Sequence, residues 1–141
     1  MILHAEEIMT LSVNIAPALD VGTNVEGHLR VIPITGGTFE GERFSGKILQ
    51  GGADWNVEIT PDVSRVHAVY CIQENDGTII SVDNFGFIDF QQESVIRTTP
   101  RFTVRSDNPK YKVFQTGVFV GALDASRSED GLIVIRIYKM R

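Results

Sequence analysis

Residues 65–82 read RVHAVYCIQENDGTIISV, and this stretch decides the fold class. Apolar side chains occupy every second position from Val66 to Ile72, as in a strand that buries one face. The pair Asp76-Gly77 follows, and a second apolar run ends at Val82. Because a tight hairpin turn requires positive φ angles, Asp-Gly between two such runs predicts a β-hairpin.

The same period of two extends towards both ends of the chain. It is present from Met9 to Ile15, and again from Ile133 to Ile137, where isoleucine occupies alternate positions. Glycines separate about eight to ten strand-like runs, which is the spacing of a sandwich or barrel. The sequence therefore predicts an all-β fold.

Only one segment favours a helix, and it is short. Residues 107–114 place Pro109 where it can open a helical turn, with Asp107 or Asn108 as the capping residue. The many short strands must hide their edges or risk association through them, and closing the sheet removes the edges. We expect a single closed antiparallel β-barrel of about eight to ten strands. Residues 1–141 are expected to form one domain.

The charge balance argues against one class of partner. The 141 residues include 18 acidic and 13 basic side chains, which gives a formal net charge of −5. Binding a phosphate backbone requires a concentrated basic surface. We therefore expect no nucleic-acid partner.

The chain also lacks the usual signals for metals, disulfides and membranes. Cys71 is the single cysteine, and no Cys/His spacing indicates zinc, so we expect neither metal nor cofactor. The N-terminus does not have the basic and apolar regions of a signal peptide. No apolar run reaches the roughly 20 residues of a membrane helix. A cytoplasmic location with no membrane partner is the expectation.

The segment Gly51 to Trp55 offers the first candidate site residues. On a strand Asp54 and Trp55 point to opposite faces, so only one of them faces the barrel interior. In one interpretation Asp54 is a general base or hydrogen-bond acceptor at the barrel mouth. In the other, Asp54 is a turn acid that accepts backbone N–H groups, and Trp55 fills the core.

A second candidate lies near Pro100. Arg97, Thr99 and Arg101 share one face if the strand continues through this proline, and two guanidinium groups there would suit a carboxylate or enolate. Pro100 can interrupt the strand, because it donates no ladder hydrogen bond. The alternative is a solvated edge with surface salt bridges.

Two polar residues of the predicted hairpin are candidates for the interior. Asn84 shares strand parity with Val82, and Tyr70 has the same character on the partner strand, so both are expected to point inward. A buried amide must be hydrogen-bonded, either by the fold or by a ligand. A satisfied polar pair in the core is the alternative.

A series of short motifs and single residues runs through these segments. They are Gly36-Gly37, Phe39-Glu40-Gly41, Arg43, Gly46, Gly51 to Trp55, Tyr70, Asp76-Gly77, Val82, Asn84, Gly86, Arg97 to Phe102 and Phe119-Val120-Gly121. In these residues the chain resembles the bacterial and fungal family called domain of unknown function 3237. The resemblance implies a barrel like those of allene oxide cyclases and dirigent proteins. It also implies an apolar cavity that steers cyclisation or coupling without metal, and assembly into oligomers. Arg43, one of the landmarks, is a further candidate ligand-binding residue.

Two functional hypotheses remain open, and both require a small-molecule pocket. In a cofactor-free isomerase or cyclase, Asp54 or Tyr70 would move a proton while Arg97 or Arg101 stabilises an oxyanion. Asn84 would contact the ligand. The cavity would be shaped by Trp55, Phe85 and Phe119. In a lipocalin-like binding module, the pocket would hold an apolar or mildly acidic small molecule without chemistry.

The last strand also carries a hint about assembly. Apolar side chains occupy both of its faces, with Val134 and Tyr138 opposite the isoleucines. A second copy of the chain would cover the outer face, so we expect a homo-oligomer.

Overall fold

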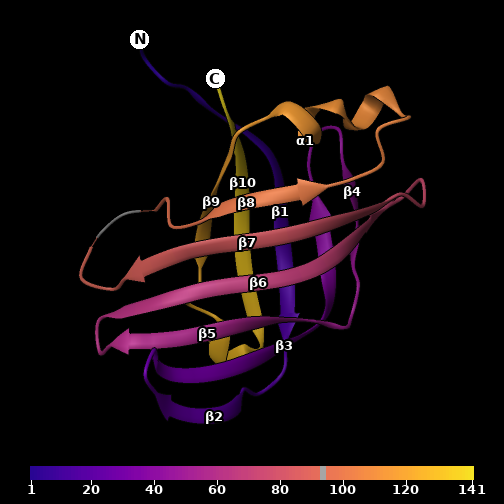
Figure 1. The fold of residues 1–141 in the computed structure, drawn as a ribbon. Coiled ribbons are helices and arrows are strands. Elements are labelled where there is room, and N and C mark those ends of the chain that lie inside the picture. The colour runs from indigo at the N-terminus through magenta and orange to yellow at the C-terminus, as the bar shows by residue number, and fades with distance from the viewer. Residues whose placement is uncertain (93–94) are drawn as a thin grey trace.

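A computed structural model gives the fold, and it describes residues 1–92 and 95–141 (Figure 1). These residues form one antiparallel sheet of ten strands, three short helical segments and connecting loops. The strands are β1 (Ala5–Ile15), β2 (Leu19–Asn24), β3 (Gly27–Glu40), β4 (Ser45–Ile48), β5 (Gly52–Thr60), β6 (Val63–Glu74), β7 (Ile79–Asp89), β8 (Thr99–Thr103), β9 (Phe119–Asp124) and β10 (Leu132–Met140). The all-β prediction is confirmed.

The sheet runs in the order β8-β7-β6-β4-β3-β1-β10-β9. Two strands lie off this path: β5 pairs with both β3 and β6, and β2 pairs with β3. Strands β5 to β8 cross in front of β1, β9 and β10 (Figure 1). An isolated bridge joins Thr98, which precedes β8, to Gly121 in β9. The Gly121 N–H donates to the Thr98 carbonyl at 2.8 Å. Backbone hydrogen bonds therefore connect the two ends of this strand order.

The predicted hairpin is present as β6 and β7. The two strands pair continuously from Val63 opposite Asp89 to Gln73 opposite Ile79. Gly77 in the turn has φ +93°, which favours glycine, and the Asp76 carboxylate accepts the Thr78 N–H at 2.9 Å. The alternation read from the sequence thus gives the observed inner and outer faces of both strands.

β3 bends at a pair of glycines so that it can pair with different strands along its length. Gly37 has φ +133°, and a Cβ there would lie 2.0 Å from the Ser12 carbonyl oxygen of β1. Only glycine permits that close approach. Before the bend β3 pairs with β2 and β5, and after it with β1 and β4.

The predicted helical turn covers one end of the core. Asn108 caps the 3-10 segment η1 (Pro109–Tyr111), which leads into α1 (Lys112–Thr116); a second segment, η2 (Ser128–Asp130), precedes β10. Tyr111 is fully buried, and its hydroxyl donates to the Asp76 carboxylate at 2.5 Å. This hydrogen bond ties the helical cap to the β6–β7 hairpin.

Aromatic side chains fill the interior beneath that cap. Phe114 packs against Phe44, Phe102 and Phe119, with ring centroids 4.8 Å, 5.0 Å and 5.9 Å away. Each such side chain contributes about 1.5–3 kcal/mol by leaving water. This aromatic cluster is one part of the hydrophobic core, and the polar residues described next belong to β5, β6 and β7.

Candidate functional site

A row of side chains crosses the inner face of the sheet from β3 to β7. Asp54 pairs with Ile32 on one side and Ala68 on the other, and Ala68 pairs with Asn84. Residues directly opposite each other on antiparallel strands point to the same face. Ala68 and Asn84 are buried, with 6% and 1% of their surfaces exposed. Asp54 therefore faces the interior, and Trp55 faces the outside of the sheet.

The local structure of β5 fixes the Asp54 carboxyl group. Its Oδ1 accepts the backbone N–H of His67 at 2.9 Å, and its Oδ2 accepts the Asn56 amide at 3.3 Å. Burial raises the pKa of Asp54, while these hydrogen bonds and the charges of His67 and Arg30 oppose the rise. The result is a carboxylate held in place and made more basic than an exposed aspartate.

Tyr70 is the next inward residue of β6 after Ala68. It is 4% exposed, and its hydroxyl has no hydrogen-bond partner among the described residues. Burial raises the pKa of this phenol strongly, so the hydroxyl stays protonated and available as a donor. A Cβ on Gly52 of β5 would lie 2.4 Å from the Tyr70 Cβ, so the glycine leaves space for this side chain.

Asn84 of β7 also carries a buried polar atom without a hydrogen-bond partner in the described part of the chain. The atom is its Oδ1. Among the described residues, the Tyr70 hydroxyl and the Asn84 Oδ1 do not satisfy each other. Buried polar groups without partners are rare in folded proteins, so these two atoms require an explanation.

The arginine associated with Asp54 is Arg30, which sequence analysis did not single out. Arg30 Nη2 donates to the Asn56 Oδ1 at 3.4 Å, and the buried Arg30 Nε has no partner within residues 1–92 and 95–141. Asn56 thus connects the guanidinium group to the Asp54 carboxylate. Arg30 has the strand parity of Ile32 and Ile34, and this parity could have indicated an inward arginine.

The structure places the arginines named from the sequence away from Asp54. Arg101 and Thr99 are exposed on the outer face of β8, since buried Pro100 and the inner row continue on the other face. Arg97 is half-buried and belongs to no strand, since it lies in the loop before β8. Arg43 is exposed between β3 and β4, with its guanidinium 5.5 Å from the Phe44 ring.

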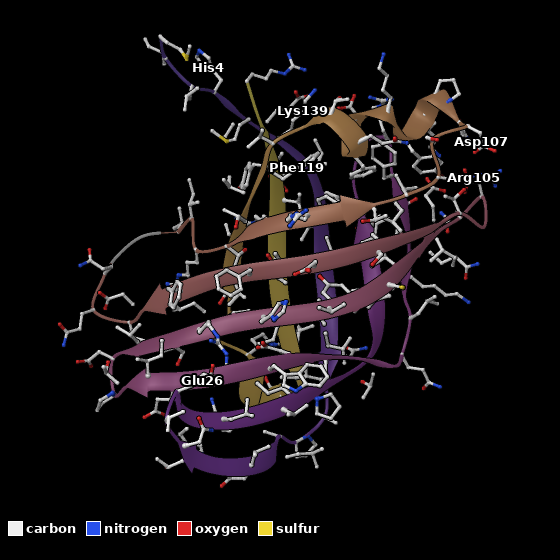
Figure 2. The ribbon with its side chains drawn as sticks, viewed as in Figure 1. His4, Glu26, Arg105, Asp107, Phe119 and Lys139 are labelled. Carbon is white, nitrogen blue, oxygen red and sulfur yellow. The ribbon has the colours of Figure 1, made fainter. Side chains whose placement is uncertain are left out.

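The three aromatic candidates also separate. Phe119, labelled in Figure 2, is buried at the start of β9 and contacts Phe102 and Phe114. Trp55 and Phe85 lie on the outer face with 47% and 38% of their surfaces exposed. Of the aromatic residues expected to shape the interior, the structure puts only Phe119 inside.

The described residues contain no cluster of three or more His, Cys, Asp or Glu side chains arranged to hold a metal ion. In the same residues, no helix is both long enough and apolar enough to cross a membrane.

Known proteins match this chain over nearly its whole length. A UPF0311 protein of Rhodopseudomonas palustris (strain TIE-1) is 28% identical, and 94% of each chain is covered. A UPF0311 protein of Clostridium acetobutylicum is 27% identical over 98% of this chain and 94% of the relative. The crystal structure of a β-barrel-like protein from Acinetobacter baumannii matches with a TM-score of 0.85 and 26% identity, covering 100% of this chain and 98% of that one.

A fungal structure shares the fold at lower sequence similarity. It is described as an enzyme from Penicillium herquei and matches with a TM-score of 0.79 and 18% identity, covering 100% of this chain and 96% of that one. The model of the family "Protein of unknown function (DUF3237)" matches residues 3–140. The chain therefore belongs to the DUF3237 family.

Proposed function

We propose that the sheet closes into a barrel whose interior, between Asp54, Tyr70 and Asn84, binds a small molecule and catalyses a proton transfer without a cofactor. Closure is supported by the Thr98–Gly121 bridge between the two ends of the strand order. It is also supported by the similar Acinetobacter baumannii protein, which is described as β-barrel-like.

The observation that carries the proposal is the pair of buried polar atoms without partners. The Tyr70 hydroxyl offers a donor, and the Asn84 Oδ1 offers an acceptor. Leaving such a group unsatisfied costs about 1–3 kcal/mol. A ligand that accepts from Tyr70 and donates to Asn84 would remove both costs on binding.

The register places these atoms around a small side chain. Ala68 separates Asp54 and Asn84 in one row, and Tyr70 follows Ala68 on the same face. Neighbouring strands are about 4.8 Å apart, so the Cα atoms of Asp54 and Asn84 lie on the order of 10 Å apart. A ligand that contacts both side chains would therefore lie across Ala68.

The reaction best matched to these groups is the isomerisation of an enolisable ketone. The Asp54 carboxylate takes the proton from the carbon next to the carbonyl, and the C–H electron pair becomes the C=C bond of an enolate. The carbonyl electrons move to oxygen, where the Tyr70 hydroxyl and the Arg30 guanidinium stabilise the negative charge. In a β,γ-unsaturated ketone, protonated Asp54 then gives the proton to the far carbon of the conjugated enolate, which shifts the double bond into conjugation with the re-formed carbonyl. The enzyme ends unchanged, and no redox partner is needed.

The raised pKa of Asp54 suits this role. A general base works best when its pKa approaches the working pH, and burial moves the Asp54 carboxyl in that direction. Arg30 takes the part that the sequence suggested for Arg97 or Arg101, because Arg30 is the arginine connected to Asp54 through Asn56.

Hydrogen exchange tests the proposal directly. The probe is 6-hydroxy-2-tetralone, which has an enolisable ketone and a phenol donor, and proton NMR in D₂O follows the loss of its α-hydrogen signal. We expect saturable acceleration by the wild-type protein and a loss of at least about 100-fold in Asp54→Asn. The matched control is Arg101→Gln on the outer face, which should exchange at the wild-type rate.

Two results would overturn the enzymatic part of the proposal. One is the absence of acceleration although the probe binds, which would favour the lipocalin-like binding module. The other is equal acceleration by Asp54→Asn and the wild type, which would remove the assigned base.

We also propose that the chain forms a homo-oligomer, through the outer face of β5 to β7 and not through that of β10, from which the sequence suggested it. Phe87, Trp55 and Val69 are 56%, 47% and 41% exposed there, and His67 Nε2 lies 3.1 Å from the Asp83 Oδ1 on the same face. An exposed apolar face of this kind can meet its own copy across a two-fold axis. Light scattering should show an oligomer that Phe87→Glu dissociates, whereas a wild-type monomer at micromolar concentration would contradict the proposal.

A further inference from the structure

Asn56 of β5 lies between two charged side chains of the interior. It follows Asp54 by two residues, so both side chains project from the same face of the strand. In the register, Asn56 is opposite Arg30 of β3. Asn56 is 8% exposed, and both ends of its amide are hydrogen-bonded. Its Nδ2 donates to the Asp54 Oδ2 at 3.3 Å, and its Oδ1 accepts from the Arg30 Nη2 at 3.4 Å. The amide therefore bridges the carboxylate and the guanidinium group.

The chemistry of the two neighbours fixes the orientation of this amide. A guanidinium group can only donate hydrogen bonds, and an ionised carboxylate can only accept them. The amide oxygen must therefore face Arg30 and the NH₂ group must face Asp54, because the reverse orientation would place donor against donor and acceptor against acceptor. An apolar residue at position 56 would make neither contact. The buried asparagine is thus explained by its contacts with both charged residues.

Arg30 and Asp54 do not form a direct ion pair. Among the described residues no salt bridge involves Arg30. Asp20 of β2 is also opposite Arg30 in the register, but its Oδ1 lies 2.6 Å from the His28 Nε2. Burial raises the pKa of Asp54, and the charge of Arg30 is the smallest of the effects that oppose the rise. The guanidinium group is therefore held near the carboxylate without neutralising it.

This separation suits a base and an oxyanion donor that act on one ligand. Asp54 must keep a lone pair free for the substrate proton, and Arg30 must keep an N–H group free for the developing oxyanion. The buried Arg30 Nε has no hydrogen-bond partner in the part of the chain that the structure describes. A direct bidentate pair would occupy the reactive atoms of both groups. An amide between them holds both side chains in place and leaves those atoms available.

We infer that Asn56 is a positioning residue, which keeps the Arg30 guanidinium group off the Asp54 carboxylate and orients both groups for a ligand. The inference rests on the proposed function for the identity of the reaction, whereas the separation of the two charges is a property of the unliganded protein. It predicts that filling position 56 with an apolar side chain and emptying it have opposite effects on the titration of Asp54.

Carbon-13 NMR titration of the Asp54 carboxyl group, assigned by its absence in Asp54→Asn, tests the inference without a ligand. Asn56→Leu removes the donor to Oδ2 but still fills the space between the charges, so the titration should move to higher pH. Asn56→Ala leaves a void through which Arg30 can reach the carboxylate, so the titration should move to lower pH. Ser64→Ala, which shortens another buried polar side chain, should leave the titration unchanged.

Arg30→Gln gives an independent readout, because it can be introduced with and without Asn56. In the wild type it should change the Asp54 titration only slightly, whereas in Asn56→Ala it should reverse the shift to lower pH. Shifts in the same direction by Asn56→Leu and Asn56→Ala would overturn the inference. A large effect of Arg30→Gln in the wild type would overturn it as well, even if the variants at position 56 do not fold.

Hydrogen exchange of 6-hydroxy-2-tetralone connects the same variants to the reaction. Asn56→Leu and Asn56→Ala should lower kcat at least about tenfold and leave KM nearly unchanged, since Tyr70 and Asn84 hold the ligand. A rise in KM without a loss in kcat would contradict the positioning role. Absence of exchange in the wild type would remove the proposed reaction, and the NMR titration would still decide whether Asn56 separates the two charges.

Discussion

Replacing Tyr70 with phenylalanine should stabilise the unliganded protein. The substitution removes a buried hydroxyl that has no hydrogen-bond partner among the described residues and keeps the ring that packs in the core. In most buried tyrosines the same change destabilises, because it removes a hydrogen bond. The sign of the effect therefore reports whether the hydroxyl is free for a ligand.

The magnitude follows from the cost of an unsatisfied buried group, about 1–3 kcal/mol. Allowing for the small void that the oxygen leaves, we expect a gain of about 1–2 kcal/mol. Unfolding entropy is about 2.1 cal/mol/K per residue, so a chain of 141 residues changes its Tm by about 3 °C for each kcal/mol. The predicted rise in Tm is about 3–7 °C.

Tyr111 provides a matched control within the same chain. It is also fully buried, but its hydroxyl donates to the Asp76 carboxylate at 2.5 Å. Tyr111→Phe should therefore lower the Tm, opposite in sign to Tyr70→Phe. Differential scanning calorimetry and urea unfolding at pH 7 measure both variants under the same conditions.

Destabilisation of the protein by about 1 kcal/mol or more in Tyr70→Phe would contradict this prediction. That result would mean that the native protein satisfies the Tyr70 hydroxyl by itself, for example through a structural water. The hydroxyl would then not be available as the donor that the proposed function requires.

Three further predictions concern the same interior, and one concerns the helical cap. Because burial raises the pKa of Asp54 above 3.8, its carboxylate costs stability as the pH rises through the folded-state pKa. Asp54→Asn should equal the wild type in stability below about pH 4 and exceed it increasingly towards pH 7, in urea unfolding at several pH values; a constant difference would contradict this. Ala68→Leu should block the ketone probe and cost less than about 1 kcal/mol if the interior has room, whereas a solid interior would make it cost about 1–3 kcal/mol. Gly52→Ala should lower the Tm and shift side-chain NMR signals of the β5–β6 pair, because the added Cβ would lie 2.5 Å from the Val69 carbonyl oxygen. An unchanged Tm would contradict this and show that β5 and β6 can move apart without cost. The hydrogen bond from Tyr111 is the main cause that lowers the pKa of Asp76 from 3.8 to about 2, so this stabilisation is complete above pH 3.8 and is lost as the pH falls towards 2. In Tyr111→Phe the dependence of unfolding free energy on pH between 2 and 4 should be flatter than in the wild type, and an equal slope would remove Tyr111 as the cause.

Local patterns were sufficient to predict the elements that depend on local physics. The β6–β7 hairpin follows from alternation and from a glycine at positive φ, and both were visible in residues 65–82. The turn capped by Asn108 follows from an Asn-Pro step. Strand parity also placed Tyr70 and Asn84 on the inner face correctly, because parity continues along an unbroken strand.

The rest of the site depends on pairing between distant strands. Whether Asp54 or Trp55 faces inward is set by the register of β5 against β6, where Asp54 lies opposite buried Ala68. The connection from Arg30 through Asn56 to Asp54 requires the register of β3 against β5 as well. No local pattern contains these registers, so sequence analysis assigned the oxyanion role to Arg97 or Arg101 and did not single out Arg30.

The most direct test of the central proposal is a high-resolution crystal structure of the protein with 6-hydroxy-2-tetralone bound, examined at Tyr70 and Asn84. We expect ligand density inside the barrel, with an oxygen within about 3.2 Å of the Tyr70 hydroxyl and a donor at a similar distance from the Asn84 Oδ1. A barrel packed with side chains, in which protein groups satisfy both atoms, would contradict it.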